Sequence, residues 1–149
     1  MRKFSIYIAA SWKLQHAVEM LTDLLRQRGH TVKSFVENNN EDPDCARAGE
    51  KKLPFDEWVW SASGKRSFDY DTTSAMFSDL VIYIGPSGKD AAAELGMAHA
   101  KGVPILGLHA KGEDFGLMRR MIKWHLNYRD LLKDVDARAV IESETGTLA

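Results

Sequence analysis

The chain opens with a short apolar run that is followed at once by apolar positions at helical spacing. Phe4–Ala9 combines β-branched and aromatic residues, which favours a strand. From Leu14 to Leu25 apolar residues recur with the period of a helix, and Gly29 is placed to end that helix. Thr31–Val36 then has the composition of a second strand. We therefore expect two parallel strands joined by a helical crossover.

A second unit of the same kind lies further along the chain. Leu80–Ile84 and Val103–Leu108 are apolar, as is typical of strands that are buried on both faces of a parallel sheet. Between them the Ala-rich segment Asp90–Lys101 has the spacing of a helix, and Gly102 can end it. A short helix is also expected near Thr72–Ser78. Together the two units predict one α/β domain with a four- or five-stranded parallel sheet.

The segment Glu37–Phe68 fits neither period. Its polar residues, such as those of Asn38–Asn40, favour a loop, whereas Phe55 and Trp58–Trp60 are compatible with an amphipathic turn. Long insertions in compact domains are often binding loops. We therefore expect a domain over residues 1–142 with an insertion at about 37–68, and a flexible tail over residues 143–149.

Composition and charge exclude several classes of protein. A length of 149 residues fits one domain, and a formal net charge of -1 gives no general field to attract nucleic acid, so any anion site must be local. The opening apolar run is too short for a signal segment, and no apolar stretch is long enough to span a membrane. The single cysteine, Cys45, is interpreted as a loop thiol, with no disulfide framework and no metal-ligand cluster. We expect a cytoplasmic protein without membrane or nucleic-acid partners.

A Gly/Pro/Ser loop, Gly85–Gly88, lies directly between a buried strand and a helix. Ligands collect at such loops, outside the carboxyl ends of parallel strands. The free N–H groups and the helix dipole there favour an anion, and Ser87 and Lys89 can add donors. The loop thus suggests a phosphate pocket, although two glycines at this spacing also serve ordinary strand-to-helix turns.

Glu94 follows this loop by one or two helical turns. Ala91 and Ala98 lie on the same face of the helix and leave open space around the carboxylate. The alternative is a solvated helix residue, which is the common state of a glutamate. His99 near the end of the helix is either a general base or a partner of the helix dipole.

The chain resembles the nucleoside 2-deoxyribosyltransferase superfamily, including its 2'-deoxynucleoside 5'-phosphate N-hydrolase branch, over roughly residues 5–122. The resemblance rests on four blocks, which are Ile6–Ala10, Asp71 with Ser78–Val81, Ala93–Ala98 and Gly102–Ile105. It implies a single three-layer flavodoxin-like (Rossmann-like) domain and a glutamate that attacks or stabilises the anomeric carbon. It also implies sites that are completed across a dimer.

Matching by motif, the resemblance gives Glu94 the place of the catalytic glutamate and Tyr7 that of the tyrosine that positions it. Asp71 takes the place of the acid near the base or sugar, and Ser87 falls near the serine that holds a 5'-phosphate. The chemistry agrees, because an oxocarbenium-like state needs one carboxylate at the anomeric face and an acid to protonate the departing base. Asp90 is an alternative second acid or a helix cap. Tyr7 is alternatively a strand core residue.

Further candidate substrate-binding residues surround these groups. They are Ser11, Trp12, Gly88, Lys89 and Asp90. Trp12, Trp58 or Trp60 could stack on a base, although a tryptophan is more often a packing residue. Gly116–Met118 and Arg120–Ile122 match the family's partner-contacting segment only loosely, and neither clearly supplies its asparagine or serine.

The leading hypothesis is cleavage of the N-glycosidic bond of a nucleoside 5'-monophosphate, preferably 2'-deoxy, without a cofactor. Three alternatives remain: a nucleoside 2-deoxyribosyltransferase, an NAD glycohydrolase similar to TIR domains, and a nucleotide-binding sensor without turnover. The resemblance, together with the surplus of apolar residues in Phe115–Leu126, also predicts a homodimer or a higher homo-oligomer.

Overall fold

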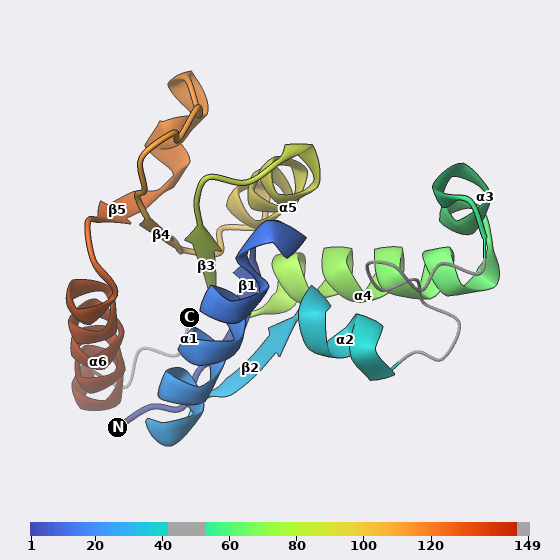
Figure 1. Cartoon of the computed structure of the whole chain (residues 1–149). Helices are drawn as coiled ribbons and strands as arrows, with labels where there is room; N and C mark the ends of the chain where they lie inside the picture. The colour runs from blue at the N-terminus through green and yellow to red at the C-terminus, as the bar shows by residue number, and fades with distance from the viewer. Residues whose placement is uncertain (42–52, 146–149) are drawn as a thin grey trace.

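The computed structural model describes residues 1–41 and 53–145, which form one α/β domain around a five-stranded parallel sheet (Figure 1). The sheet order is β2-β1-β3-β4-β5, which is the flavodoxin-like order. The strands are β1 (Ser5–Ala9), β2 (Thr31–Ser34), β3 (Leu80–Ile84), β4 (Ile105–Leu108) and β5 (Lys123–His125). The helices are η1 (Trp12–Leu14), α1 (Gln15–Gln27), α2 (Phe35–Glu41), α3 (Phe55–Val59), α4 (Ala62–Phe77), α5 (Lys89–Ala100), η2 (Leu117–Met121) and α6 (Tyr128–Thr145). The predicted fold class is confirmed, with five strands.

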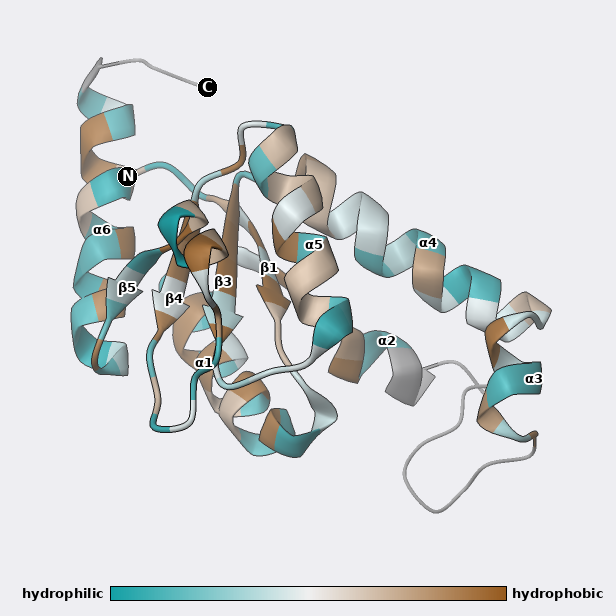
Figure 2. Cartoon of the chain, turned by 90° about the horizontal axis from the view of Figure 1, so that it is seen from above, coloured by the Kyte–Doolittle hydropathy of each residue, from teal (hydrophilic) through white to brown (hydrophobic). Residues whose placement is uncertain are grey.

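Two hydrophobic clusters, one on each face of the sheet, create the three layers. Side chains alternate between the faces of a strand, so Ile6 and Ile8 of β1 pack with α1 and α6. Tyr7 and Ala9 of the same strand belong to the opposite cluster, together with residues of α5. Figure 2 shows the apolar strands between the two helical layers. This alternation turns Tyr7 towards α5.

The second strand ends two residues earlier than the sequence pattern predicts. β2 stops at Ser34, and Phe35 and Val36 begin α2 instead. Both side chains are buried in the cluster that covers α1 and α6, at 6% and 1% exposure. These two residues are therefore apolar because they are buried in the core from a helix, and not because they belong to a strand. The expected boundary at Val36 was wrong for this reason.

The helix expected near Thr72–Ser78 is much longer, because α4 begins at Ala62 inside the segment interpreted as an insertion. The Oγ of Ser61 accepts a hydrogen bond from the Gly64 N–H and caps the helix. The buried face of α4 consists largely of small residues, Ser63, Gly64, Ser67, Ser74 and Ala75. Small residues leave no apolar period in the sequence, which explains why the part of the helix before Thr72 was not predicted. Figure 1 shows α4 extending away from the sheet, with α3 at its far end.

The C-terminal part of the described chain adds an edge strand and a helix. β5 pairs parallel with β4, and α6 continues through Thr145, past residue 143 where the tail was expected to begin. Asp134 anchors α6 to β5, because its carboxylate contacts Lys123 at 2.9 Å and His125 at 2.8 Å. Residues 146–149 lie outside the described part of the chain, as does Cys45.

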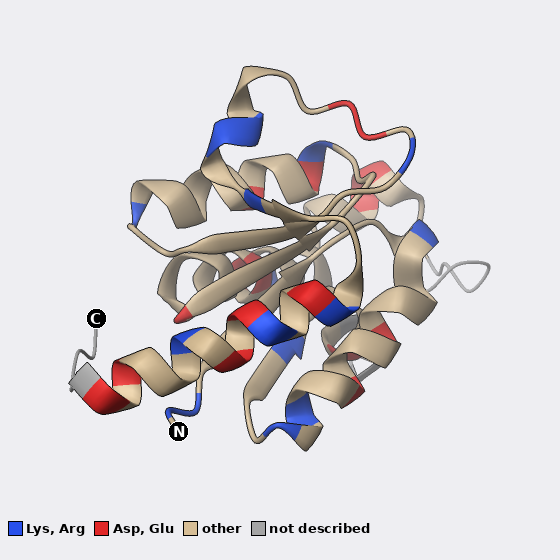
Figure 3. Ribbon diagram, turned by 90° about the vertical axis from the view of Figure 1, so that its left-hand side faces the viewer, with Lys and Arg blue, Asp and Glu red and all other residues tan. Residues whose placement is uncertain are grey.

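Charged residues of both signs lie on the helices and loops around the sheet (Figure 3). In the described ranges, no helix combines the length and the apolar character that crossing a bilayer requires.

Candidate functional site

Tyr7 and Glu94 form the centre of the candidate site. The Tyr7 hydroxyl donates a hydrogen bond of 2.6 Å to Oε1 of Glu94, from β1 to α5. Tyr7 is fully buried and Glu94 is 9% exposed. Burial, followed by the charges of Asp71 and Glu94, raises the pKa of Tyr7 well above its usual value, so its hydroxyl remains a donor. The structure therefore brings together the two residues that the resemblance pairs.

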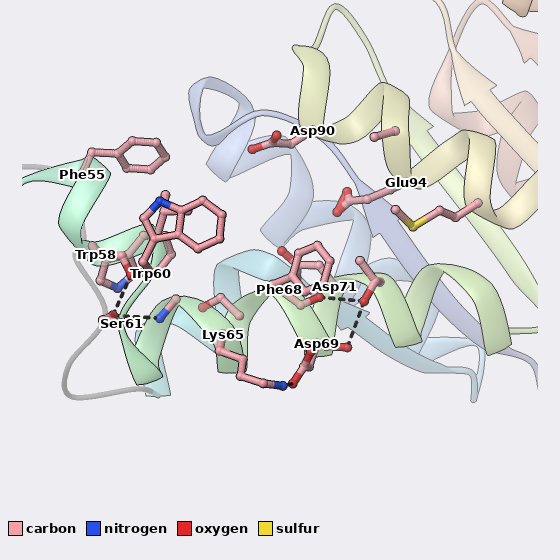
Figure 4. Close-up of a pocket in the computed structure, with 16 residues that line it drawn as sticks. Phe55, Trp58, Trp60, Ser61, Lys65, Phe68, Asp69, Asp71, Asp90 and Glu94 are labelled. Carbon is pink, nitrogen blue, oxygen red and sulfur yellow. Dashed lines mark hydrogen bonds and ion pairs between the residues drawn. The ribbon is translucent and has the colours of Figure 1, made fainter.

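A pocket of about 810 Å³ opens beside Glu94, between α5 and the arm formed by α3 and α4. This volume is within the usual range of small-molecule sites, ~300–1,000 Å³. The lining residues are Phe55, Trp58, Val59, Trp60, Ser61, Gly64, Lys65, Ser67, Phe68, Asp69, Asp71, Thr72, Asp90, Ala93, Glu94 and Met97. Figure 4 shows Asp71 and Glu94 at one end, the α3 aromatic residues at the other, and Phe68 and Asp90 between them.

The carboxyl of Glu94 titrates near neutral pH. Burial raises the pKa of Glu94 to about 7, with a further rise from the charge of Asp90, while the hydrogen bond from Tyr7 acts in the opposite direction. Tyr7 thus keeps part of the Glu94 population ionised in a pocket that would otherwise protonate it.

Asp71 projects from α4 towards the same pocket. Burial raises the pKa of Asp71 to about 8, helped by the charge of Glu94, and the Tyr7 hydroxyl again opposes the shift. The Oδ1 atom of Asp71 is buried and has no hydrogen-bond partner among the described residues. Both pKa values are thus raised to neutral pH or above, so the pair can supply one protonated acid and one carboxylate.

The Ser87 loop lies outside this pocket and is held by its own hydrogen bonds. The Ser87 hydroxyl donates to the Ile84 carbonyl at 2.8 Å and accepts from the Ser11 N–H at 2.9 Å. Its N–H donates to the Tyr83 hydroxyl, which in turn donates to Glu113. Ser87 and Ser11 thus connect the loops after β3 and β1, and donation from Ser87 to a phosphate requires release of Ile84.

The start of α5 lies between this loop and the pocket. Gly88 is the N-cap residue and supplies no side-chain hydrogen bond, so the first amides of α5 lack a side-chain cap. Lys89 is exposed beside them. Asp90 lies in the first turn, where its side chain lines the pocket. The helix-cap interpretation of Asp90 is thus wrong, because Gly88 holds that position.

Of the three tryptophans predicted to stack on a base, two line the pocket and one does not. Trp12 is 36% exposed, makes a T-shaped contact with Phe35 at 5.1 Å between ring centroids, and does not line the pocket. Trp58 and Trp60 do line it. Sequence reasoning missed Phe68, which also lines the pocket, because the α4 pattern that would place it on the same helix as Asp71 is weak.

Two other predicted features lie away from the pocket. His99 is exposed in the last turn of α5 and is not among the lining residues. The segment from Gly116 to Ile122 contains η2 and does not line the pocket either. Within residues 1–41 and 53–145, no cluster of three or more His, Cys, Asp or Glu side chains is arranged to hold a metal ion.

The fold and the pocket together define a class: a flavodoxin-like α/β domain with a tyrosine-bound glutamate in a pocket beside its sheet. Solved structures with this fold include a 2-deoxyribosyltransferase from Bacillus psychrosaccharolyticus, with a TM-score of 0.64 and 24% identity over 85% of this chain and 89% of that one. A CMP N-glycosidase from Clostridium botulinum matches with a TM-score of 0.54 and 19% identity, over 89% of this chain and 98% of that one.

A conserved protein from Enterococcus faecalis matches with a TM-score of 0.61 and 19% identity, over 92% of this chain and 99% of that one. No protein-family model and no curated protein matches the chain in sequence. The predicted resemblance to the nucleoside 2-deoxyribosyltransferase superfamily is thus confirmed at the level of the fold.

Proposed function

We propose that the protein cleaves the N-glycosidic bond of a nucleoside 5'-monophosphate, preferably a 2'-deoxynucleotide, with Glu94 as the catalytic carboxylate. The observation that carries this proposal is the hydrogen bond of 2.6 Å from Tyr7 to Glu94 in a pocket shared with Asp71. Fold neighbours that are a 2-deoxyribosyltransferase and a CMP N-glycosidase support the same bond type.

The two carboxyl groups take complementary roles in this proposal. The ionised Glu94 attacks the anomeric carbon while the bond from that carbon to the base nitrogen breaks, and the proton on Asp71 passes to the departing base. Water then adds to the anomeric carbon of the glycosyl ester and loses its proton to Asp71. Free sugar phosphate and Glu94 carboxylate are released. Tyr7 holds one oxygen of Glu94, so the other faces the sugar.

The start of α5 suits the phosphate. Gly88 precedes Glu94 by six residues, which corresponds to about 9 Å along the helix axis. Helical side chains tilt back towards the N-terminus, so the Glu94 carboxylate lies closer to the first amides than this figure. A sugar at Glu94 can therefore direct its 5'-phosphate towards the free amides of α5, Ser87 and the Lys89 amine.

A transferase is the second candidate, because the fold neighbour with 24% identity is a 2-deoxyribosyltransferase. In that reaction an acceptor base replaces water at the anomeric carbon. The NAD glycohydrolase and the sensor without turnover remain outcomes of the test, since function depends on the site and not on the fold.

The test is a panel of 2'-deoxynucleoside and ribonucleoside 5'-monophosphates, the matching nucleosides and NAD, each with and without an acceptor base. Free base is followed by chromatography. We expect base release without an acceptor and a higher kcat/KM for monophosphates than for nucleosides. Turnover only with an acceptor would assign a transferase, and nicotinamide release from NAD alone would assign a glycohydrolase. Binding without any base release would reject the enzyme.

We also propose a homodimer. Part of the apolar segment that suggested it is used inside the domain, because Ile122 is buried and Phe115 and Trp124 pack with Tyr83. Three exposed apolar residues remain there, Leu117 at 75%, Met118 at 53% and Leu126 at 82%. Sedimentation at micromolar concentration tests the proposal, and a monomer would contradict it.

A further inference from the structure

The pocket extends past the two carboxyls into a region rich in exposed aromatic side chains. Trp60 is 88% exposed, Phe68 62% and Phe55 53%, and all three line the pocket. Figure 4 shows Trp60 beside α3 and Phe68 next to Asp71. Large apolar side chains in contact with water are unfavourable and commonly mark a binding surface.

The arm that carries these residues is built to hold them in place. The Trp58 indole N–H donates to Ser63 Oγ at 3.1 Å, and Phe55 packs on Trp58 with ring centroids 5.9 Å apart. α3 lies so close to Gly64 that an added Cβ would lie 2.2 Å from the Trp58 carbonyl oxygen. This close approach requires glycine there and fixes α3 on α4. The aromatic side chains at the pocket are therefore carried by two helices that are packed against each other.

Acidic side chains outnumber basic ones around these aromatic residues. Four carboxyl groups line the described pocket, those of Asp69, Asp71, Asp90 and Glu94. Lys65 is the lone Lys or Arg among the described lining residues, and its amine is 2.6 Å from an oxygen of Asp69. An anion is disfavoured in such surroundings, whereas a cation gains both from the carboxylates and from the faces of aromatic rings.

We propose that the base end of this pocket selects N-glycosides whose base carries a fixed positive charge, such as N7-alkylated purines or N-glycosylated pyridinium rings. This inference rests on the proposed function, in which the sugar lies at Glu94. The base then extends between Asp71, Phe68 and Trp60, while the 5'-phosphate lies outside the pocket, towards Lys89.

The chemistry of a cationic base suits the same two carboxyls. When its bond to the anomeric carbon breaks, the base keeps the bonding electron pair and leaves as a neutral heterocycle, so no proton from Asp71 is needed. Glu94 forms the same glycosyl ester, and water then displaces it from the anomeric carbon and loses its proton to Asp71, which releases that proton to solvent. The positive charge of the bound base favours the ionised form of Asp71, so the carboxylate can pair with the cation before cleavage. A neutral base still requires the Asp71 proton.

The first test measures binding without turnover. The unmodified protein is titrated with 1-methylnicotinamide, a cation, and with nicotinamide, its neutral counterpart, and affinity is measured by calorimetry. We expect the cation to bind roughly tenfold more tightly. Phe68→Leu should reduce this preference, whereas Phe77→Leu, a 68% exposed phenylalanine of the same helix outside the pocket, should not.

Equal affinity for the two ligands would overturn the inference, even if base release from neutral nucleotides is found. A change in sedimentation of Phe68→Leu without a change in cation affinity would also overturn it, because the aromatic surface would then be a protein interface. If no N-glycoside is cleaved, the proposed function fails while the binding preference is still measured.

The second test compares two substrates in Asp71→Asn. The rate of base release is measured in a single turnover, because hydrolysis of the glycosyl ester is common to both substrates. For 2'-deoxyguanosine 5'-monophosphate, the loss of the acid should lower this rate by roughly 10²-fold or more. For its N7-methyl analogue the rate of base release at saturation should change little and the affinity should fall, since only the pairing with the cation is lost. Equal losses in the rate of base release for both substrates would contradict the proposed recognition of a cationic base.

Discussion

The hydroxyl of Tyr7 lies 2.6 Å from Oε1 of Glu94, and neither residue is more than 9% exposed. This hydrogen bond acts to lower the pKa of Glu94, whereas burial raises it. The resulting pKa is about 7. The Tyr7 hydroxyl also acts to lower the pKa of Asp71, which burial and the charge of Glu94 raise to about 8. One buried phenol thus tunes both carboxyl groups of the pocket.

Tyr7→Phe should move the pH profile of kcat/KM to higher pH. Phenylalanine keeps the burial but removes the hydrogen bond, so the pKa of Glu94 and that of Asp71 both rise. Less Glu94 is then ionised at pH 6, where we expect a loss of about tenfold or more, and the loss should be smaller at pH 8. Tyr128→Phe, on an exposed side chain of α6, serves as control. A uniform loss at all pH values would show that Tyr7 acts only in packing.

Glu94→Gln should stabilise the folded protein at pH 8. The folded pKa of Glu94, about 7, is above the value of 4.5 expected when unfolded, so the wild type loses stability as pH rises through this window. Glutamine avoids that loss, and we expect a gain in the free energy of unfolding on the order of 2–3 kcal/mol at pH 8 and little gain at pH 4. Urea denaturation at both pH values measures it, with Glu19→Gln on the surface of α1 as control. An equal effect at both values would refute the assigned pKa.

Ser87→Ala should weaken binding of a nucleoside 5'-monophosphate more than binding of the matching nucleoside. The serine hydroxyl connects the loops after β1 and β3 and lies next to the free amides of α5. We expect a loss of roughly tenfold in phosphate-dependent affinity, as for one lost hydrogen bond to a charged group. Calorimetric titration of both ligands gives the ratio, and Ser143→Ala on α6 controls for serine removal. Equal weakening of both ligands would limit Ser87 to a structural role.

Three strands, β1, β3 and β4, could be predicted because they are runs of mostly apolar residues, and β2 because it follows the helix stop at Gly29. No strand was predicted at β5, because Lys123–His125 forms no apolar run. The pairing of Glu94 with Tyr7 followed from the resemblance, and the geometry agrees because alternation along β1 turns Tyr7 towards α5. Glu94 and Asp71 both line the pocket, whereas Ser11, Trp12 and Ser87 do not. For these residues, proximity in sequence to a strand end did not determine which side chains face the cavity.

The full extent of the arm formed by α3 and α4 could not be predicted, because its sequence shows little hydrophobic periodicity. Its buried face contains serine, glycine and alanine, which pack closely but give no hydrophobic period. Trp60 and Phe68 gave no core pattern either, because they are exposed. The C-terminal helix was also not predicted, although its buried residues Leu131, Leu132, Val135 and Ala139 recur at helical spacing between charged positions.

The rate of base release by Glu94→Gln tests the central claim most directly. Glutamine keeps the size of the side chain and can still accept the Tyr7 hydrogen bond, but it can neither attack the anomeric carbon nor balance an oxocarbenium charge. We expect a loss of at least about a thousandfold, equivalent to roughly 4 kcal/mol of transition-state stabilisation, in single-turnover experiments on the nucleotide that the wild type cleaves fastest. Circular dichroism and ligand affinity should be retained, and Glu19→Gln should keep the wild-type rate. Base release by Glu94→Gln at the wild-type rate would contradict the assignment of Glu94 as the catalytic carboxylate.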